Sequence, residues 1–414
     1  MKKLFNFLKN HPIYCLIIVI CVVFLPGAII AKPQAESKLI IRALGIDKAG
    51  DEYQVSAIAF LPKASQSFQE NYKIVEGKGR TLYDAVSAAA KETGKDIGLA
   101  HTGIVFVNDE ICREGLVEAI DFLVRDYSLG NDTYVVYVPE STKELVEAAH
   151  NLAMSSGIHL GDVAGYDERK VVHGESNIES IYDSAYSPSK CSLMTVMEMS
   201  EEEGLEPGGG QNTGGTGGEG QSGGGGGGVG QSQKKILNEE KILILKEGKK
   251  ALILEPEQTK KYKWTKSSNF ADALTLENYS DKNFKNATLS LSVSSNNVSQ
   301  RLSFKNGKPI FTFLIKPKLS IVEVNQDNLD DDIFIDVSKF ETEKLKTTIN
   351  NKIKNEVYDF IQTFVDANTD INMIYEKFNA EKTSQFQSFL EGLENKENFL
   401  SEIKFYVEVD CKIE

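Results

Sequence analysis

Two hydrophobic periods alternate along the best-defined part of the chain, one of about 3.6 residues and one of two. Apolar residues follow Thr81 at three- and four-residue steps until Gly94, which predicts an amphipathic helix. A second stripe with the same spacing predicts a helix over residues 109–126. Apolar, β-branched runs at residues 102–107 and 134–138 predict strands before and after that helix. The helix supplies the crossover that parallel strands need, so we expect these two strands to pair in parallel.

Further elements flank this block. Residues 38–46 and 53–61 are strand candidates separated by a turn rich in Asp and Gly, so we expect a hairpin. Ser141, followed three residues later by a glutamate, matches a capping box and predicts a third helix. Residues 191–199 predict another strand. We therefore expect an α/β region over residues 36–203.

Residues 233–414 predict an α+β region of one or two subdomains. An apolar hairpin is expected to turn at residues 247–249, and a second at Asn306-Gly307, because both of these residues tolerate positive φ. From Glu341 onward, apolar residues fall at helical steps over 20 residues. Residues 403–413 alternate strictly between apolar and polar, which indicates a final strand with one buried face. The predicted fold is multidomain, α+β or mixed α/β, with mixed sheets flanked by helices.

Composition adds a linker and excludes one class of partner. In residues 208–230, 15 of 23 positions are glycine, so residues 204–232 are expected to form a flexible linker or loop. This tract lacks the Gly-Lys-Ser/Thr ending of a phosphate-binding loop. The net charge is −14, and residues 1–33 contain no Asp or Glu, so the remainder is more acidic still. A large nucleic-acid-binding surface is therefore not expected.

The N-terminus predicts a membrane anchor. Residues 13–31 carry no charge over 19 positions, which at about 1.5 Å per residue spans the roughly 30 Å core of a bilayer. Lys2, Lys3 and Lys9 precede this run, so we expect residues 1–12 to form a cytoplasmic tail and the body to face outward. A cleaved signal peptide is the alternative interpretation.

Motifs for catalysis or metal binding are not found. The five cysteines are scattered, with no spacing that suggests a disulfide framework or a zinc site. We predict no catalytic residues, no cofactor and no metal. His101 stands before a buried strand, where it could contact a ligand or act as a proton switch, or simply hydrogen-bond at the strand edge. The charged residues of the second helix could pair along its surface or dock a partner; they are Arg113, Glu114, Glu118 and Arg125.

Several ordered segments carry a resemblance to a known family. They are RALGID (residues 42–47), YQVSAIAF, GRTLYDAV and LAHTGIVFVNDEICREGLVEAIDFLVRD. Together they resemble the Ger(x)C family of spore germination proteins, the membrane-attached C subunits of nutrient germinant receptors, over most of the chain after residue 36. The resemblance implies a non-catalytic subunit on the outer face of the spore's inner membrane, assembling with multi-pass membrane subunits. It leaves open whether this chain binds a nutrient itself.

The chain departs from the family pattern at three places. The family's lipoprotein cysteine has no counterpart, because Cys21 lies inside the apolar run after Ile20. The glycine tract is an addition. The glycine-containing stretch that the family places after an aspartate is absent at Asp370, where the sequence is DINMIYEKF.

Two alternative functions are kept open. A tethered hydrolase would need a deep polar cleft with His101 beside a carboxylate. A tethered solute-binding protein would need a ligand-sized cleft between two hinged lobes. A shallow surface with large apolar or aromatic patches would favour the receptor subunit.

Overall fold

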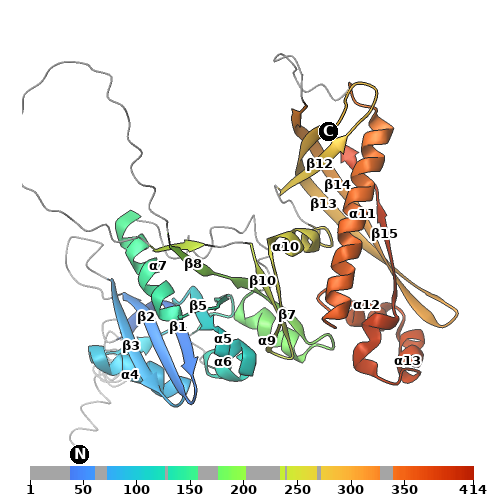
Figure 1. Cartoon of the computed structure of the whole chain (residues 1–414). Helices are drawn as coiled ribbons and strands as arrows, with labels where there is room; N and C mark the ends of the chain where they lie inside the picture. The colour runs from blue at the N-terminus through green and yellow to red at the C-terminus, as the bar shows by residue number, and fades with distance from the viewer. Residues whose placement is uncertain are drawn as a thin grey trace, which may run out of the picture.

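The computed structural model describes residues 38–60, 72–125, 129–156, 176–201, 234–237, 240–267, 272–326 and 339–414. These residues fold into two modules, one built on a nine-stranded sheet and the other on a five-stranded sheet (Figure 1). The expected anchor, residues 13–31, and the glycine tract lie outside the described residues. Among the helices of the described part, none has the length and apolar character needed to cross a membrane.

The first module has a mixed sheet with a parallel centre. Its strands are β1 (Lys38–Ala49), β2 (Glu52–Phe60), β3 (Tyr72–Gly79), β4 (Asp96–Gly98), β5 (Ile104–Asn108), β6 (Tyr134–Val138), β7 (Cys191–Val196), β10 (Ile242–Lys246) and β11 (Lys249–Leu254). The strand order is β11-β10-β7-β6-β5-β1-β2-β3, with β4 also beside β1. Strands β1, β5, β6 and β7 are parallel, whereas β2, β3, β10 and β11 join antiparallel. The predicted β1–β2 hairpin and parallel β5–β6 pair are confirmed.

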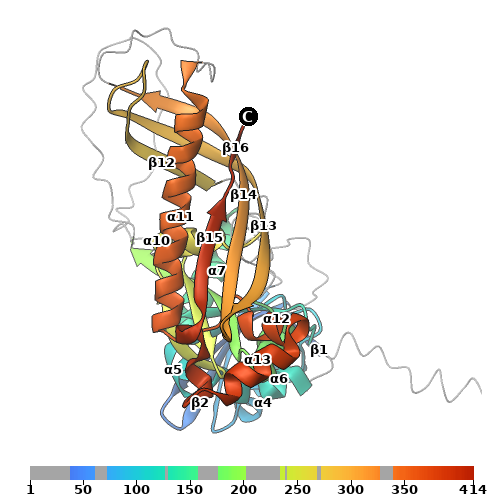
Figure 2. The ribbon, with the colours of Figure 1, turned by 90° about the vertical axis from the view of Figure 1, so that its right-hand side faces the viewer.

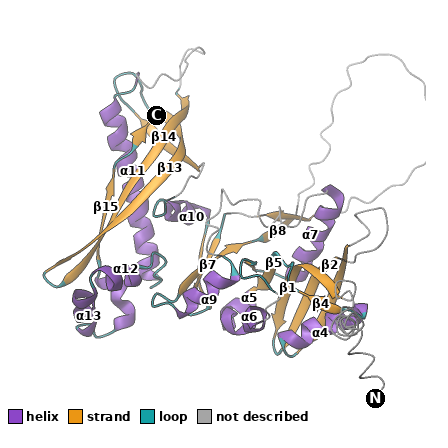
Figure 3. Cartoon of the chain, turned by 180° about the vertical axis from the view of Figure 1, so that it is seen from behind, coloured by secondary structure: helices purple, strands orange, loops and turns teal. Residues whose placement is uncertain are grey.

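Helices cover both faces of this sheet. The helices of the module are α4 (Leu82–Thr93), α5 (Asp109–Glu114), α6 (Leu116–Arg125), α7 (Thr142–Ser156) and α9 (Ile178–Tyr186). Buried residues of α4, α5, α6 and α9 share one core with the sheet, and those of α7 share another on the opposite face (Figure 3). The layers are therefore helix, sheet, helix, as the alternating pattern predicts.

Two sequence-based boundaries in the first module are wrong. The single helix predicted over residues 109–126 is two helices, because Gly115 adopts φ 150° and the next amide, of Leu116, donates to the carbonyl of Gly248 at 2.8 Å. The single strand predicted over residues 191–199 is also two strands. β8 (Glu198–Glu201) leaves the main sheet and pairs with β9 (Lys234–Leu237) in a separate two-stranded sheet.

Gly45 and Asp47, two residues of the RALGID motif, hold α7 against β1. A Cβ on Gly45 would lie only 2.7 Å from Thr142 Oγ1, so glycine allows the helix to approach the strand closely. Asp47 accepts hydrogen bonds from the amides of Thr142 and Lys143 at 2.8 and 3.3 Å. Ser141 donates its hydroxyl to the same carboxylate. The helix predicted here is confirmed, but a carboxylate from a distant strand caps its first turn.

The second module places a long helix along a mixed sheet (Figure 2). Its elements are α10 (Pro256–Lys263), β12 (Asp272–Tyr279), β13 (Ala287–Lys305), β14 (Lys308–Asn325), α11 (Thr342–Asp366), α12 (Ile374–Glu381), α13 (Thr383–Glu391), the 3₁₀ helix η4 (Lys396–Glu402), β15 (Lys404–Val409) and β16 (Lys412–Ile413). The order is β12-β13-β14-β15, and β15 and β16 both run parallel to β14. Asn306 and Gly307 turn the β13–β14 hairpin with φ of 53° and 77°, as predicted. The predicted long helix is also confirmed, whereas the single final strand predicted over residues 403–413 is two strands, β15 and β16, with a break at residues 410–411.

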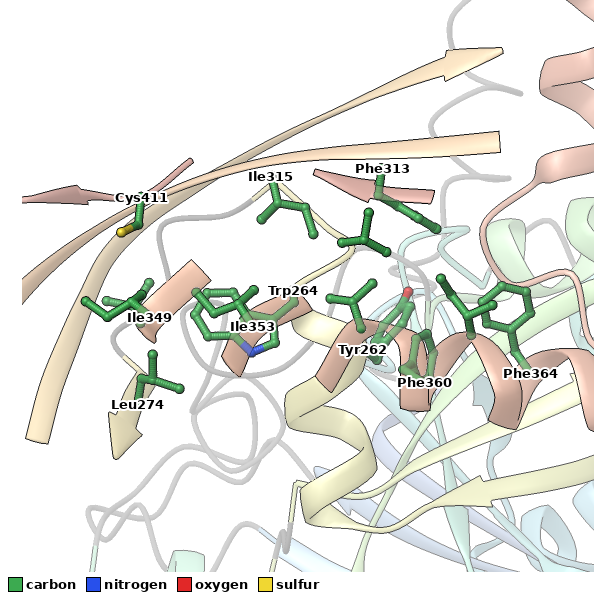
Figure 4. Close-up of a cluster of buried hydrophobic side chains, with 14 of the residues drawn as sticks. Tyr262, Trp264, Leu274, Phe313, Ile315, Ile349, Ile353, Phe360, Phe364 and Cys411 are labelled. Carbon is green, nitrogen blue, oxygen red and sulfur yellow. The ribbon is translucent and has the colours of Figure 1, made fainter. Parts of the chain in front are cut away.

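The two modules share a core. In the second module, Tyr262 and Trp264 pack between the sheet and α11, whose Ile349, Ile353 and Phe360 face them (Figure 4). Residues of the first module's β7, β10 and β11 belong to the same cluster; they are Cys191, Leu193, Ile242, Ile244 and Leu254. The hairpin β10–β11, which follows the glycine tract in sequence, completes the first sheet. That sheet is therefore built from residues on both sides of the tract.

Candidate interaction surface

The start of α5 is fixed by an ionic cluster around Asp109. One carboxylate oxygen of Asp109 accepts hydrogen bonds from Tyr137 Oη at 2.6 Å and Lys250 Nζ at 2.7 Å. The other oxygen lies 2.7 Å from Arg113 Nε. Burial tends to raise the pKa of Asp109, but its hydrogen bonds with Lys250 and Tyr137 and the nearby positive charges outweigh this and hold the pKa below its usual value. The ionised carboxylate therefore joins α5 to β6 and β11.

Most of the residues that the sequence analysis selected lie on α5 and α6. Arg113 is 69% exposed and pairs with Asp109, one helical turn before it. Glu114 is 51% exposed and pairs with Lys48 of β1. Glu118 is exposed on the first turn of α6. Three of these residues are thus held close together on one surface, which we call the α5–α6 face.

The remaining candidates lie elsewhere. Arg125 is at the C-terminal end of α6, where it pairs with Asp121. His101 lies in an exposed turn between β4 and β5, at the end of the sheet where β5 begins. Because α5 follows the other end of β5, the sheet separates His101 from the α5–α6 face. The structure therefore does not combine the five candidates into one site.

The junction between the modules holds a buried carboxylate that the sequence analysis did not select. Asp370 is 3% exposed and accepts the amides of Ile374 and Tyr375 at 2.7 and 2.8 Å, at the start of α12. Burial raises the pKa of Asp370 to about 6. Across the junction, burial raises the pKa of Cys191 to about 12, and Asp370 adds to this increase. A capping aspartate before an apolar helix is a local signal that could have identified Asp370.

Polar contacts cross the same junction. The Ser189 amide donates to Glu376 Oε1 at 2.8 Å, and Lys246 Nζ donates to the Asn368 carbonyl at 2.7 Å. Met373 adopts φ 52° directly before α12. The loop between α11 and α12 is therefore held to the first module by its backbone as well as by side chains.

Two grooves are described on the surface of the described residues. One runs along α4 and β4 with a volume of about 460 Å³, and the other lies between α10, β12 and α11 with a volume of about 550 Å³. Neither is lined by His101. Within the described residues no group of three or more His, Cys, Asp or Glu side chains is placed to hold a metal ion.

Comparisons with known proteins agree with one another. Two family models match the chain, Spore germination protein N-terminal domain over residues 33–199 and Spore germination B3/GerAC like, C-terminal, over residues 240–414. A search of curated proteins finds no match. Among solved structures, the crystal structure of the GerBC protein superposes with a TM-score of 0.51 and 13% identity, covering 89% of this chain and 96% of that one. At this identity the structural match concerns the fold.

Proposed function

This chain belongs to the Ger(x)C family of spore germination proteins, and we propose that it is a non-catalytic, membrane-anchored subunit of a nutrient-germinant receptor. The observation that carries the proposal is the match of both family domains, which together span residues 33–199 and 240–414. The shared core between the modules supports it further, because solute-binding lobes that hinge around a ligand need a cleft where these modules pack together.

Membrane attachment is proposed to reside in residues 13–31. Their 19 uncharged positions are long enough to span, and the preceding lysines favour a cytoplasmic tail. The two modules then face away from the cytoplasm. Mass spectrometry of the mature protein from spore membranes should find residues 1–31 present and Cys21 unmodified. A diacylglyceryl group on Cys21, or a mature N-terminus after residue 31, would contradict this mode of attachment.

Assembly is proposed to use the α5–α6 face. Glu114 and Glu118 are exposed there, and the ionic cluster of Asp109 fixes the backbone beneath them. A preorganised surface loses little conformational entropy on binding. The negative charges of Glu114 and Glu118 are complementary to a basic extracytoplasmic segment of a multi-pass receptor subunit.

Charge reversal tests this assignment. The variant Glu114→Lys/Glu118→Lys should reduce recovery of the other receptor subunits from spore membranes at least fivefold and slow nutrient-triggered germination. The variant loses the Glu114–Lys48 ion pair, but an exposed pair contributes only about 1 kcal/mol or less, so its melting temperature should stay within a few degrees of the parent. The matched control, Glu391→Lys/Glu394→Lys, changes the same charge on an exposed part of the second module. Equal recovery with both variants would place the docking surface elsewhere.

A further inference from the structure

Charge is distributed unevenly between the two ends of the first module. We call the end where β1 begins the proximal end, and the end with the β1–β2 turn at Gly50 the distal end. Acidic residues dominate the distal end; they are Asp47, Asp51, Glu52, Asp84, Asp109, Glu110, Glu114, Glu140 and Glu144. The basic residues there are fewer, namely Lys48, Lys78, Arg80, Arg113, Lys143 and Lys250. The distal end is therefore repelled by an anionic surface.

The proximal end differs in charge and in apolar content. Lys91 is exposed in the last turn of α4, and Lys95 follows just before β4. The acidic residues at this end are Glu92, which is paired with Lys73 at 2.7 Å, and the exposed Asp96, Asp132 and Glu179. Acidic and basic residues are therefore close to balance here, whereas the distal end has an acidic excess. Phe60 and Tyr72 form a half-buried ring pair here, with centroids 5.3 Å apart. Amphipathic aromatic and lysine side chains are the types that suit a membrane–water interface.

A groove along α4 opens at the same side. Its lining combines apolar positions with two lysines, Lys91 and Lys95, and one carboxylate, Asp96; the apolar members are Val86, Ala90, Ile97 and Leu99. Tyr83, which is 63% exposed, lines the groove at the first turn of α4, toward the distal end. Cationic groups beside an apolar surface can contact phosphate and the start of an acyl chain together.

Chain length restricts which end can approach a membrane. Residue 31 ends the uncharged run and β1 begins at Lys38. Seven residues reach at most about 25 Å when fully extended. The start of β1 pairs with β4, at Lys38 and Asp96, so Lys95 lies directly beside the point where the chain enters the module. The proximal end is thus the part of the module held nearest to an anchor.

We propose that the proximal end, through the groove between α4 and β4, lies against anionic phospholipid headgroups. This inference rests on the proposed anchoring by residues 13–31. Because β1 has 12 residues, at about 3.3 Å each the distal end then stands about 40 Å from the headgroups. A receptor subunit that docks on the α5–α6 face must therefore do so through a portion that extends from the membrane.

The test uses the full chain in nanodiscs of phosphatidylglycerol or of phosphatidylcholine. Acetylation of individual lysines is followed by mass spectrometry. Lys91 and Lys95 should react at least fivefold more slowly in the anionic discs, and about 1 M salt should remove most of this difference, since it shortens the Debye length to about 3 Å. Lys78, exposed on β3 near the distal end, is the internal control and should react at rates within twofold in both lipids.

A second measurement identifies the bound molecule directly. Photoreactive benzoylphenylalanine replaces Ser87, which lines the groove, or Asp51 at the distal turn. A phospholipid adduct should form at position 87 and not at position 51. Adding Lys91→Glu/Lys95→Glu should reduce the adduct at least fivefold, whereas Lys78→Glu/Arg80→Glu should not.

The outcomes separate this inference from the anchoring. A chain that does not co-elute with nanodiscs refutes the anchor, and the inference with it. A chain that co-elutes but shows equal acetylation in both lipids and no adduct at position 87 keeps the anchor and refutes the inference. A protein adduct at position 87 in spore membranes, without lipid, would assign the groove to a partner protein instead.

Discussion

The first module has largely aliphatic cores on the two faces of its sheet and a few polar contacts between elements that are distant in sequence, whereas the second is held by a dense aromatic core. Asp47 and Asp109 each connect segments about a hundred or more residues apart, to Thr142 and Lys250 respectively. In the second module, rings of α11, α12, α13 and the sheet contact one another in series; they include Phe311, Phe360, Phe364, Phe378, Phe386 and Phe405. Packing therefore stabilises both modules, and the first also presents a charged surface that polar contacts hold in place.

The largest expected effect is the loss of an aromatic ring from the second core. Phe360 is fully buried and contacts Tyr262 and Phe364. Phe360→Ala should lower the free energy of unfolding by about 3–5 kcal/mol. Leu123→Ala, at a fully buried position of α6 in the first module, should cost about 2–5 kcal/mol. Urea unfolding followed by two probes measures both.

The shared core also predicts how many unfolding transitions Phe360→Ala and Leu123→Ala should show. Since residues of β7 and β10 belong to the second module's cluster, both modules should unfold in one transition in either variant. Separate transitions for the two modules would show that the junction is weaker than its packing suggests. The two modules would then be separate folding units.

The second expected effect depends on pH and concerns the junction. The folded pKa of Asp370 is about 6, raised by burial from 3.8. The folded state therefore binds this proton more tightly than the unfolded state. The stabilisation is fully present below about pH 4 and is lost as the pH rises to about 6, in total on the order of 3 kcal/mol. Asp370→Asn should remove this pH-dependent contribution to the free energy of unfolding.

The measurement compares the free energy of unfolding of parent and variant between pH 4 and pH 7. The difference between the two curves isolates Asp370, because the other titrating groups are common to both. The Asn side chain keeps one oxygen to accept an amide at the start of α12. Parallel curves would mean that Asp370 is ionised throughout this range and that solvent reaches the junction.

A smaller effect concerns how α7 is capped. Asp47→Ala removes the acceptor for the amides of Thr142 and Lys143 and should cost about 1–2 kcal/mol. Ser141→Ala should cost less than Asp47→Ala, because Ser141 Oγ only donates to that carboxylate at 3.2 Å. Thermal or urea unfolding of both variants decides between a local and a long-range cap. A larger cost for Ser141→Ala than for Asp47→Ala would instead support the local capping box that the sequence predicts.

These capping variants also show where sequence reasoning succeeds and where it stops. Periodicity predicts α4, α11 and the β13–β14 hairpin well, because their buried faces follow from residues within one element. It cannot predict that Asp47 caps α7, since this contact depends on β1 and α7 being neighbours in the sheet. The break at Gly115 was likewise missed, although a glycine inside a helical stripe is a warning.

The candidate surface was predictable only in part. Helical spacing places Arg113, Glu114 and Glu118 on an exposed face, which the structure confirms. Helical spacing cannot predict that His101 lies at the other end of the sheet, because its position depends on the direction of β5 within the sheet. The residues that support the surface, Tyr137 and Lys250, come from a buried strand and from beyond the glycine tract. Contacts between residues so far apart in the sequence leave no local sequence pattern from which they could be predicted.

The smallest expected effect returns to the loop where the chain departs from its family. Met373 has φ 52° and ψ 43° and is 42% exposed, so its side chain adds little packing to offset the left-handed backbone. That conformation costs a residue other than glycine about 1–2 kcal/mol, and glycine itself loses about 0.5–1 kcal/mol through the unfolded chain. Met373→Gly should therefore stabilise the protein by about 0.5 kcal/mol. Asn306→Gly is the matched control, because Asn tolerates its φ of 53° in the hairpin turn and should gain less. If Met373→Gly instead destabilises the protein, the methionine contributes to the junction through its side chain, and packing would extend into the one loop that we assign to polar contacts.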